Sequence, residues 1–364
     1  MRAQHLLARL SLAALIGFGA SIIVMQFEER SKRGVQGSTK GSAKGRIESG
    51  SHTDFREGGD AQAPTEIPAG GWVAIARRIY GEVGKDRVLA VAAGVTFYGL
   101  LALFPAVTAF VSLYGIVADP AEVAGQLAIA EGLLPAGALE VVRDQITRIA
   151  TGDQTRLGVA FLISLGLSAW SANAGVKALF DALNVAYGEE EKRSFIRLNL
   201  TTLGFTLAIL LFALLALGAI AAVPVLLDFL YLGAAAEWLL WLGRWPALIL
   251  LLMLGLSALY RFGPSRDNAQ WKWVSPGAIL ASVTWLLGSI AFSWYVANFE
   301  DYNETYGALG AVVALLMWMW LSATIILVGA ELNSEAERQT LRDTTQGAPE
   351  PIGFRGADAA DNKG

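Results

Sequence analysis

The chain of 364 residues has no cysteine and only two histidines, His5 and His52, both in its N-terminal extension. The lack of cysteine excludes disulfide bonds, thiolate nucleophiles and cysteine-ligated metals. The rest of the chain also lacks the side chain most used as a base near neutral pH and as a zinc ligand. The spacing of the carboxylates does not suggest a metal site. We therefore expect no enzyme activity, no cofactor and no bound metal.

Charged residues are scarce as well, at 16% of the chain, against about 25% in ordinary soluble domains. They gather in loops and near both ends, while hydrophobic residues make up 54% of the sequence. The stretch 307–330 has no charged side chain, and at ~1.5 Å rise per residue it can cross a ~30 Å hydrocarbon layer. The lipid bilayer is thus the expected partner, and the net charge of −4 does not point to nucleic acid.

Six apolar stretches predict an all-α fold, a polytopic membrane helical bundle with six core transmembrane helices. They are residues 88–117, 157–176, 198–226, 245–260, 274–297 and 306–330. The fourth is the shortest and reaches a full span only if 239–242 joins it and Arg244 extends to the interface. Before the first, apolar residues at helical spacing over 72–83 predict an amphipathic helix at the bilayer surface.

The expected six-helix domain, 71–335, has a different kind of segment on each side. Residues 1–27 hold an apolar run that fits a signal anchor, a signal peptide or a start codon placed too far upstream. No small-x-small cleavage site follows the run, which favours an additional, signal-anchor helix. Residues 28–70 and 336–364 are polar, so we expect a disordered linker and a disordered cytoplasmic tail.

Lysine and arginine are concentrated on alternate connections, and this bias predicts how the chain is threaded. One set of flanks contains Arg77, Arg78, Lys85, Arg87, Lys192, Arg193, Arg197, Arg261, Arg266, Lys272, Arg338 and Arg342. The opposite flanks contain only Arg143, Arg148, Arg156 and Arg244. We therefore place both ends of the six-helix core, and with them the C-terminus, in the cytoplasm.

A polar stripe follows one face of the second span at helical steps of four and three residues: Asn173, Lys177, Asp181 and Asn184. If the helix ends near Val176, the lysine and the aspartate are simply solvated. If it continues to Tyr187, they lie in the protein interior, where charge in hydrocarbon costs ~2.5–3.5 kcal/mol per residue. The second alternative makes the stripe a candidate binding site.

Two further positions could serve function, and each also has a structural explanation. Pro105 interrupts the backbone hydrogen bonds of the first span, either as a packing kink or as a hinge beside a binding site. Glu331 ends the last span after Gly329 and Ala330. It is either a solvated carboxylate or, because small neighbours allow close helix approach, half of a buried ion pair with Arg193 or Arg261.

An ordered set of short motifs gives the chain a resemblance to a known family. The motifs are Ala92-Ala93-Gly94, Phe97-Tyr98, Leu103-Phe104-Pro105, Trp170-Ser171, Ala182-Leu183-Asn184, Tyr187, Arg193-Ser194-Phe195, Tyr260, Pro264, Trp271-Lys272, Ser275-Pro276-Gly277-Ala278, Tyr295, Asn298-Phe299, Tyr302, Tyr306-Gly307, Trp318, Ser322 and Leu327-Val328-Gly329-Ala330-Glu331-Leu332-Asn333. Taken in order over about 72–335, they resemble the YihY/BrkB family of bacterial inner-membrane proteins, once labelled ribonuclease BN. The chain departs from the pattern at Ser265, where Asn is usual, and at Ala308, where a small hydroxyl residue is frequent.

The resemblance implies a multi-pass protein of the bacterial inner (plasma) membrane whose activity is not established, with transport, envelope integrity and virulence among the roles proposed for the family. Our first hypothesis is a transporter or channel-like protein for an unidentified solute or lipid. The alternative is a non-transporting protein that interacts with lipid or maintains the envelope. A membrane ribonuclease is disfavoured, since the six-span core has no histidine and no cysteine. The substrate and the oligomeric state do not follow from these residues.

Overall fold

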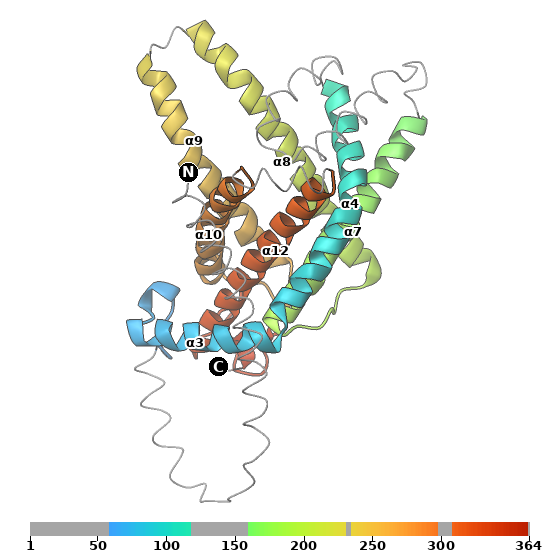
Figure 1. The fold of residues 1–364 in the computed structure, drawn as a ribbon. Coiled ribbons are helices and arrows are strands. Elements are labelled where there is room, and N and C mark those ends of the chain that lie inside the picture. The colour runs from blue at the N-terminus through green and yellow to red at the C-terminus, as the bar shows by residue number, and fades with distance from the viewer. Residues whose placement is uncertain (1–57, 118–158, 231–233, 298–307, 363–364) are drawn as a thin grey trace, which may run out of the picture. The chain divides into compact units, whose positions relative to one another are not determined.

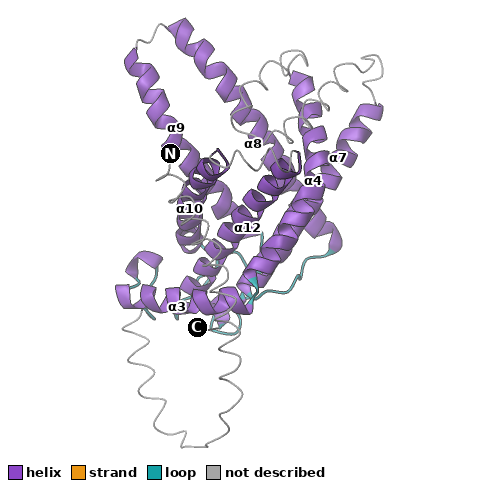
Figure 2. Ribbon diagram, viewed as in Figure 1, coloured by secondary structure: helices purple, strands orange, loops and turns teal. Residues whose placement is uncertain are grey.

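The computed structural model describes residues 58–117, 159–230, 234–297 and 308–362. Within these ranges the chain is a bundle of α-helices without a strand, as Figure 2 shows. The long helices are α4 (Val88–Val117), α7 (Val159–Tyr187), α8 (Phe195–Leu230), α9 (Ala234–Phe262), α10 (Trp271–Ala297) and α12 (Ala308–Gln339). Three shorter elements accompany them: η1 (Pro64–Glu66), α3 (Ala69–Lys85) and α13 (Asp358–Asp361). The all-α bundle predicted from the apolar stretches is therefore confirmed.

Four helices contain stretches that are long and apolar enough to cross a membrane. They are Val88–Val107, Phe195–Ala213, Trp271–Val296 and Val312–Gln339, with a shorter apolar stretch, Ile249–Phe262, in α9. Large apolar side chains such as Leu167, Leu254 and Leu287 are exposed on the outside of the bundle, as expected where the solvent is lipid. The other two predicted spans correspond to α7 and α9, and a total of six spans stays a prediction.

Helix α12 lies at the centre of the bundle, in contact with α3, α4, α7, α10 and α13 (Figure 1). Glycines set its approach to α10, because a Cβ added to Gly277 would overlap the carbonyl oxygen of Gly329. At the same crossing Asn333 inserts its amide into the first turns of α10. Its Oδ1 accepts from the Gly277 N–H at 2.7 Å, and its Nδ2 donates to the Val274 carbonyl at 3.1 Å. Small residues thus bring two backbones together where a polar side chain can join them.

The amphipathic helix predicted over 72–83 corresponds to α3, which crosses one end of the bundle in Figure 1. Its inner face buries Ile75 against Trp273 of α10 and Ala336 of α12. The same cluster contains Ala61 and Ile67, two apolar residues in the segment predicted to be a disordered linker. The last part of that segment, from residue 58, therefore packs on the bundle. The segments 1–57 and 118–158, with the predicted N-terminal helix, lie outside the described residues.

The C-terminal segment differs most from its prediction, since 340–362 folds over the end of α12 rather than forming a disordered tail. Arg355 organises it: this buried side chain donates to the carbonyl oxygens of Leu341, Arg342, Glu350 and Ala360. An isolated bridge between Ala269 and Thr345 ties the segment to the α9–α10 connection. Composition alone could not reveal this, because the ordering depends on backbone carbonyls gathered around one guanidinium. We call this end of the bundle, formed by α3, 188–194, 263–270 and 340–362, the basic end.

The α10–α12 crossing predicts a sharp difference between two glycine substitutions. Gly277→Ala should lower the melting temperature in detergent, at a cost of roughly 1–3 kcal/mol, because the added methyl group forces the helices apart. The control is Gly204→Ala in α8, where a Cβ meets nothing within 4 Å. That change should be neutral or stabilising, since Ala favours helix over Gly by ~1 kcal/mol. Equal melting temperatures for the two variants would contradict the crossing.

Candidate functional site

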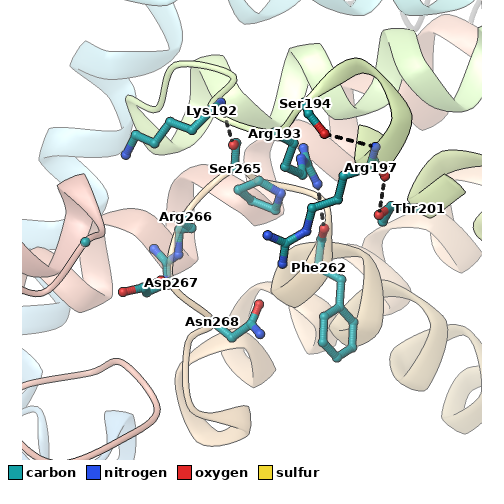
Figure 3. Close-up of a pocket in the computed structure, with 12 residues that line it drawn as sticks. Lys192, Arg193, Ser194, Arg197, Thr201, Phe262, Ser265, Arg266, Asp267 and Asn268 are labelled. Carbon is teal, nitrogen blue, oxygen red and sulfur yellow. Dashed lines mark hydrogen bonds between the residues drawn. The ribbon is translucent and has the colours of Figure 1, made fainter. Parts of the chain in front are cut away.

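A pocket of about 530 Å³ opens at the basic end, between the start of α8 and the α9–α10 connection. Figure 3 shows the side chains that surround it. Four cationic residues line the pocket, Lys192, Arg193, Arg197 and Arg266, and Asp267 is its one acidic residue. Ser194, Thr201, Ser265 and Asn268 add polar groups to the wall. The lining is therefore suited to a small anion or to the anionic part of a larger molecule.

The first turn of α8 forms one side of this pocket. Ser194 precedes the helix and caps it: its Oγ accepts from the Arg197 N–H at 3.4 Å, and its carbonyl accepts from the Leu198 N–H at 2.9 Å. The N–H groups of the first helical residues have no partner within a helix and carry partial positive charge. The Arg197 side chain forms no ion pair within the described part of the chain. An unneutralised guanidinium thus stands beside a helix N-terminus, an arrangement that favours anions.

The other cations of the pocket form ion pairs with carboxylates that do not line it. Lys192 pairs with Glu189 at 2.8 Å, and its exposed ammonium keeps further donors free. Arg193 makes a two-pronged contact with Glu191, at 2.8 Å from Nε and 2.7 Å from Nη2. Arg266 is completely buried and donates through Nη2 to both oxygens of Glu337, at 2.8 and 2.9 Å. Its Nε and Nη1 have no protein partner, so this arginine retains unused donors.

The two connections that frame the pocket are fastened to each other by side chains. Asn184 accepts from the Ser265 N–H at 2.8 Å and donates to Glu191 at 3.1 Å. Arg193 donates to the carbonyl of Gly263 at 2.8 Å, and the Lys192 N–H donates to Ser265 Oγ at 2.8 Å. The serine found where the resembled family usually has Asn therefore still supplies a hydrogen-bond acceptor. The frame of the pocket is built from contacts between residues about 70 to 80 positions apart.

Glu191 is the electrostatic centre of this fastening. Desolvation alone would raise its pKa, but hydrogen bonds from the Arg193 side chain and backbone and from Asn184 outweigh it and lower the pKa to about 2. The carboxylate is therefore charged at every physiological pH, and Arg193 is neutralised. Lys192 is affected in the same way by its own partner. The hydrogen bond to the Glu189 carboxylate raises the pKa of Lys192, which therefore stays a cation.

The polar stripe predicted on the second span is divided by the structure. The helix α7 does continue to Tyr187, but only Asn173 and Asn184 are buried, while Asp181 is exposed and Lys177 half-buried. Each four-residue step turns about 40° around a helix of 3.6 residues per turn, and this drift carries Asp181 away from the buried face. The carboxylate and the ammonium do not form an ion pair in the described chain. Instead, the Lys177 ammonium lies 5.2 Å from the Trp170 ring and 6.0 Å from the Phe195 ring.

Asn173 and Asn184 have different environments. Asn173 accepts from Thr206 of α8 at 3.2 Å, and its Nδ2 is buried without a partner. Asn184 belongs to the frame of the pocket. Of the predicted stripe, the structure thus places one member at the pocket and one at a buried α7–α8 contact. Pro105 lies inside α4 without a break in the helix, and its role as a hinge stays a prediction.

The predicted ion pair of Glu331 with Arg193 or Arg261 is not what the structure shows. Glu331 is 1% exposed, so it is not a solvated carboxylate and lies buried, as the ion-pair alternative required. Arg193, however, is bound to Glu191, and Arg261 donates to the Ala269 carbonyl and to Gln346 while its guanidinium lies 4.5 Å from the Trp271 ring. Both arginines therefore have other partners. One oxygen of Glu331 has no hydrogen-bond partner in the described part of the chain.

Arg193 thus binds Glu191 and not Glu331, and Arg197, expected only as a flanking charge, lines the pocket. The signal that could have identified Arg197 was local: Ser194 is a favourable N-cap residue, placed three positions before it at the start of an apolar helix. Among the described residues no group of three or more His, Asp or Glu side chains is placed to hold a metal ion. The chemistry that this arrangement offers is binding of an anion.

Comparison with known proteins places these features in a family. A model of the family described as "Virulence factor BrkB" matches residues 79–352. The ribonuclease-like protein YfkH of Bacillus subtilis is 33% identical over 252 residues, which cover 66% of this chain and 87% of YfkH. The UPF0761 membrane protein Mpe_A1422 of Methylibium petroleiphilum is 24% identical over 301 residues, 78% of this chain and 67% of that protein. The UPF0761 membrane protein MS0032 of Mannheimia succiniciproducens is 35% identical over 85 residues, 23% and 29% of the two chains. No solved structure matches the chain.

The pKa of Glu191 predicts how the frame of the pocket responds to acid. A folded-state pKa of about 2, below the ordinary ~4.3, means that the stabilisation is complete above about pH 4.3 and is lost as the pH falls towards 2. Glu191→Gln should lower the free energy of unfolding at pH 7 by roughly 1 kcal/mol, a value reduced by partial exposure of the pair. The gap between variant and parent should narrow as the pH falls below about 4. Denaturant titration of Glu190→Gln, at an exposed neighbour, provides the control, and a gap independent of pH would contradict the assignment.

Proposed function

We propose, from the premise that this chain belongs to the BrkB family of membrane proteins, that it is a transporter or channel-like protein for an anionic solute, with its basic end in the bacterial cytoplasm. The orientation is supported by the sequence bias of Lys and Arg. The described flanks predicted to share one side also meet at one end of the structure, where Arg78, Arg266 and Arg338 all bind α12 or its neighbours. The family match supports the membrane part of this proposal, and the pocket supports the solute.

The observation that carries the proposal is the unneutralised Arg197 beside the start of α8. The partial positive charge of a helix N-terminus and a neighbouring guanidinium act on the same bound anion. Lys192, exposed next to them, adds donors. A phosphate or carboxylate group bound there would lie at the N-terminus of α8, whose first part is a candidate membrane span. This is where a solute would first be captured from the cytoplasm.

A lipid headgroup is the second source of the same chemistry, and one observation favours it. Phe195, Ile196 and Leu200, in the first turns of α8, are exposed apolar residues next to the pocket. A phospholipid could place its phosphate against Arg197 and its acyl chains along these side chains. A protein that only held such a lipid would be a lipid-interacting envelope protein. The word ribonuclease in the name of YfkH is not extended to this chain, because residues 58–364 contain no histidine and no cysteine.

Reconstitution into liposomes separates these functions. Radiolabelled inorganic phosphate serves as the soluble probe, and vesicles with or without phosphatidylglycerol provide the headgroup. Uptake of phosphate above protein-free vesicles supports transport, whereas retention of phosphatidylglycerol through purification without any flux supports the lipid role. In either case Arg197→Gln should weaken binding at least about 10-fold, since charge-assisted hydrogen bonds contribute roughly 1.5–3 kcal/mol.

Arg77→Gln is the matched control, because Arg77 of α3 is also exposed and lies outside the pocket. It should bind both probes as the parent does. Equal binding by the Arg197→Gln variant and the parent, to phosphate and to phosphatidylglycerol, would contradict the assignment of the pocket.

A further inference from the structure

One acidic side chain of the bundle forms no ion pair with the residues that the structure describes. Glu331, on α12, is 1% exposed, and its Oε1 has no hydrogen-bond partner. Its surroundings are apolar, with Val88 and Val91 of α4 and Leu327 of α12 lining the same small hollow. A carboxylate without a partner in such a place is strongly disfavoured, so the side chain has to find a cation or hold a proton.

Another acid lines the same hollow. Asp86, at the corner between α3 and α4, lies within side-chain hydrogen-bond range of Glu331 and lines the same hollow. Two carboxyl groups form a hydrogen bond only if one of them carries a proton, because two carboxylates offer acceptors alone. Asp86 is half-buried and reaches solvent, whereas Glu331 does not. The proton is therefore held by Glu331, and Asp86 accepts from it.

The remaining charges around the two acids do not replace this proton. Glu82 of α3 and Glu335 of α12 add negative charge. Arg338 adds positive charge, but it is itself bound to Glu335 and Asp358. From α7, the buried Tyr187 adds a phenol and not a cation. Burial and the charge of Glu82 also raise the pKa of Asp86.

We propose that Glu331 and Asp86 form a one-proton site that couples protonation to the position of the α3–α4 corner. Loss of the proton would leave two carboxylates facing each other in a mostly apolar hollow, and their repulsion acts directly between α12 and the corner. The corner is already unusual, because Arg87 has a φ of 53°, in the left-handed region that few non-glycine residues adopt. Asp86 connects the site to water, so a proton can leave Glu331 through it.

This inference extends the proposed function, since it names the proton as the ion whose binding would be coupled to movement of the anion. The site lies on α12 six positions before Glu337, the carboxylate that holds Arg266 at the anion pocket. A change in the position of α12 at Glu331 therefore reaches the pocket through one rigid helix. Charged or titratable groups inside a membrane helix are expected to serve such relays.

The test uses the intact protein in detergent and does not depend on transport. Glu331→Gln replaces the protonated acid by a neutral group of the same shape. The parent should lose thermal stability as the pH rises across the neutral range, because its folded state binds a proton that the unfolded state releases. The Gln variant should lack this loss and melt at or above the parent at pH 8. Infrared spectroscopy should show the carbonyl band of a protonated carboxyl in the parent at pH 7 and not in the variant.

Asp86→Asn provides the second variant, since it keeps the hydrogen-bonding shape and removes the repelling charge.

 The charge of Asp86 opposes ionisation of Glu331, so we expect the Asn variant to release the proton at a lower pH than the parent. Its carbonyl band at pH 7 should therefore be weaker than that of the parent.

The outcomes separate the proton site from the transport function. A Glu331→Gln variant that melts below the parent at pH 7 to 8, or a parent without the carbonyl band, would overturn the proton site. In liposomes that carry phosphate flux, a pH gradient should change the flux through the parent and not through Glu331→Gln, and an equal response of both would overturn the coupling. If no phosphate flux is found but the band and the pH-dependent melting are, the proposed transport fails while the proton site stands.

Discussion

The buried acidic segment at the end of α12 is the constraint on which the basic end of this protein depends. Three carboxylates on that helix, Glu331, Glu335 and Glu337, are each 1% exposed or less. Burial of a carboxylate is costly unless it is paired or protonated. Two of the three, Glu335 and Glu337, are paired with cations from elsewhere in the chain, and Glu331 is the one for which we propose a proton. Glu335 binds Arg78 of α3 and Arg338, and Glu337 binds Arg266 and the hydroxyl of Thr344. These contacts bring α3, the α9–α10 connection and the C-terminal segment onto one helix.

The same constraint joins the two sites. Arg266 lines the anion pocket, is neutralised by Glu337, and lies 4.8 Å from the ring of Tyr187. The buried phenol of Tyr187 lies in turn within electrostatic range of Glu331. A chain of polar groups therefore connects the pocket to Glu331. Close crossings such as the one at Gly277 and Gly329 hold other helices of the bundle together.

Much of this architecture is predictable from sequence, because the solvent dictates it. The apolar stretches correspond to the long helices, the amphipathic pattern to α3, and the Lys and Arg bias to the flanks that meet at the basic end. The predictions that failed concern partners. Arg266 and Glu337 are 71 positions apart, and nothing in either neighbourhood indicates their pairing. The C-terminal segment is polar in composition, yet Arg355 orders it by collecting carbonyl oxygens that only the fold brings together. The stripe on α7 was divided by helical drift, which spacing in steps of four conceals over a short distance.

A double-mutant cycle on Arg266 and Glu337 tests most directly whether buried charge organises the basic end. Thermal or denaturant unfolding in detergent would compare Arg266→Gln, Glu337→Gln and the double variant with the parent. Each single variant should cost about 3–5 kcal/mol, since it leaves an uncompensated buried charge, and the double variant should cost clearly less than the sum. Additive losses, or single variants as stable as the parent, would show that the fold does not depend on this pair and would contradict the account.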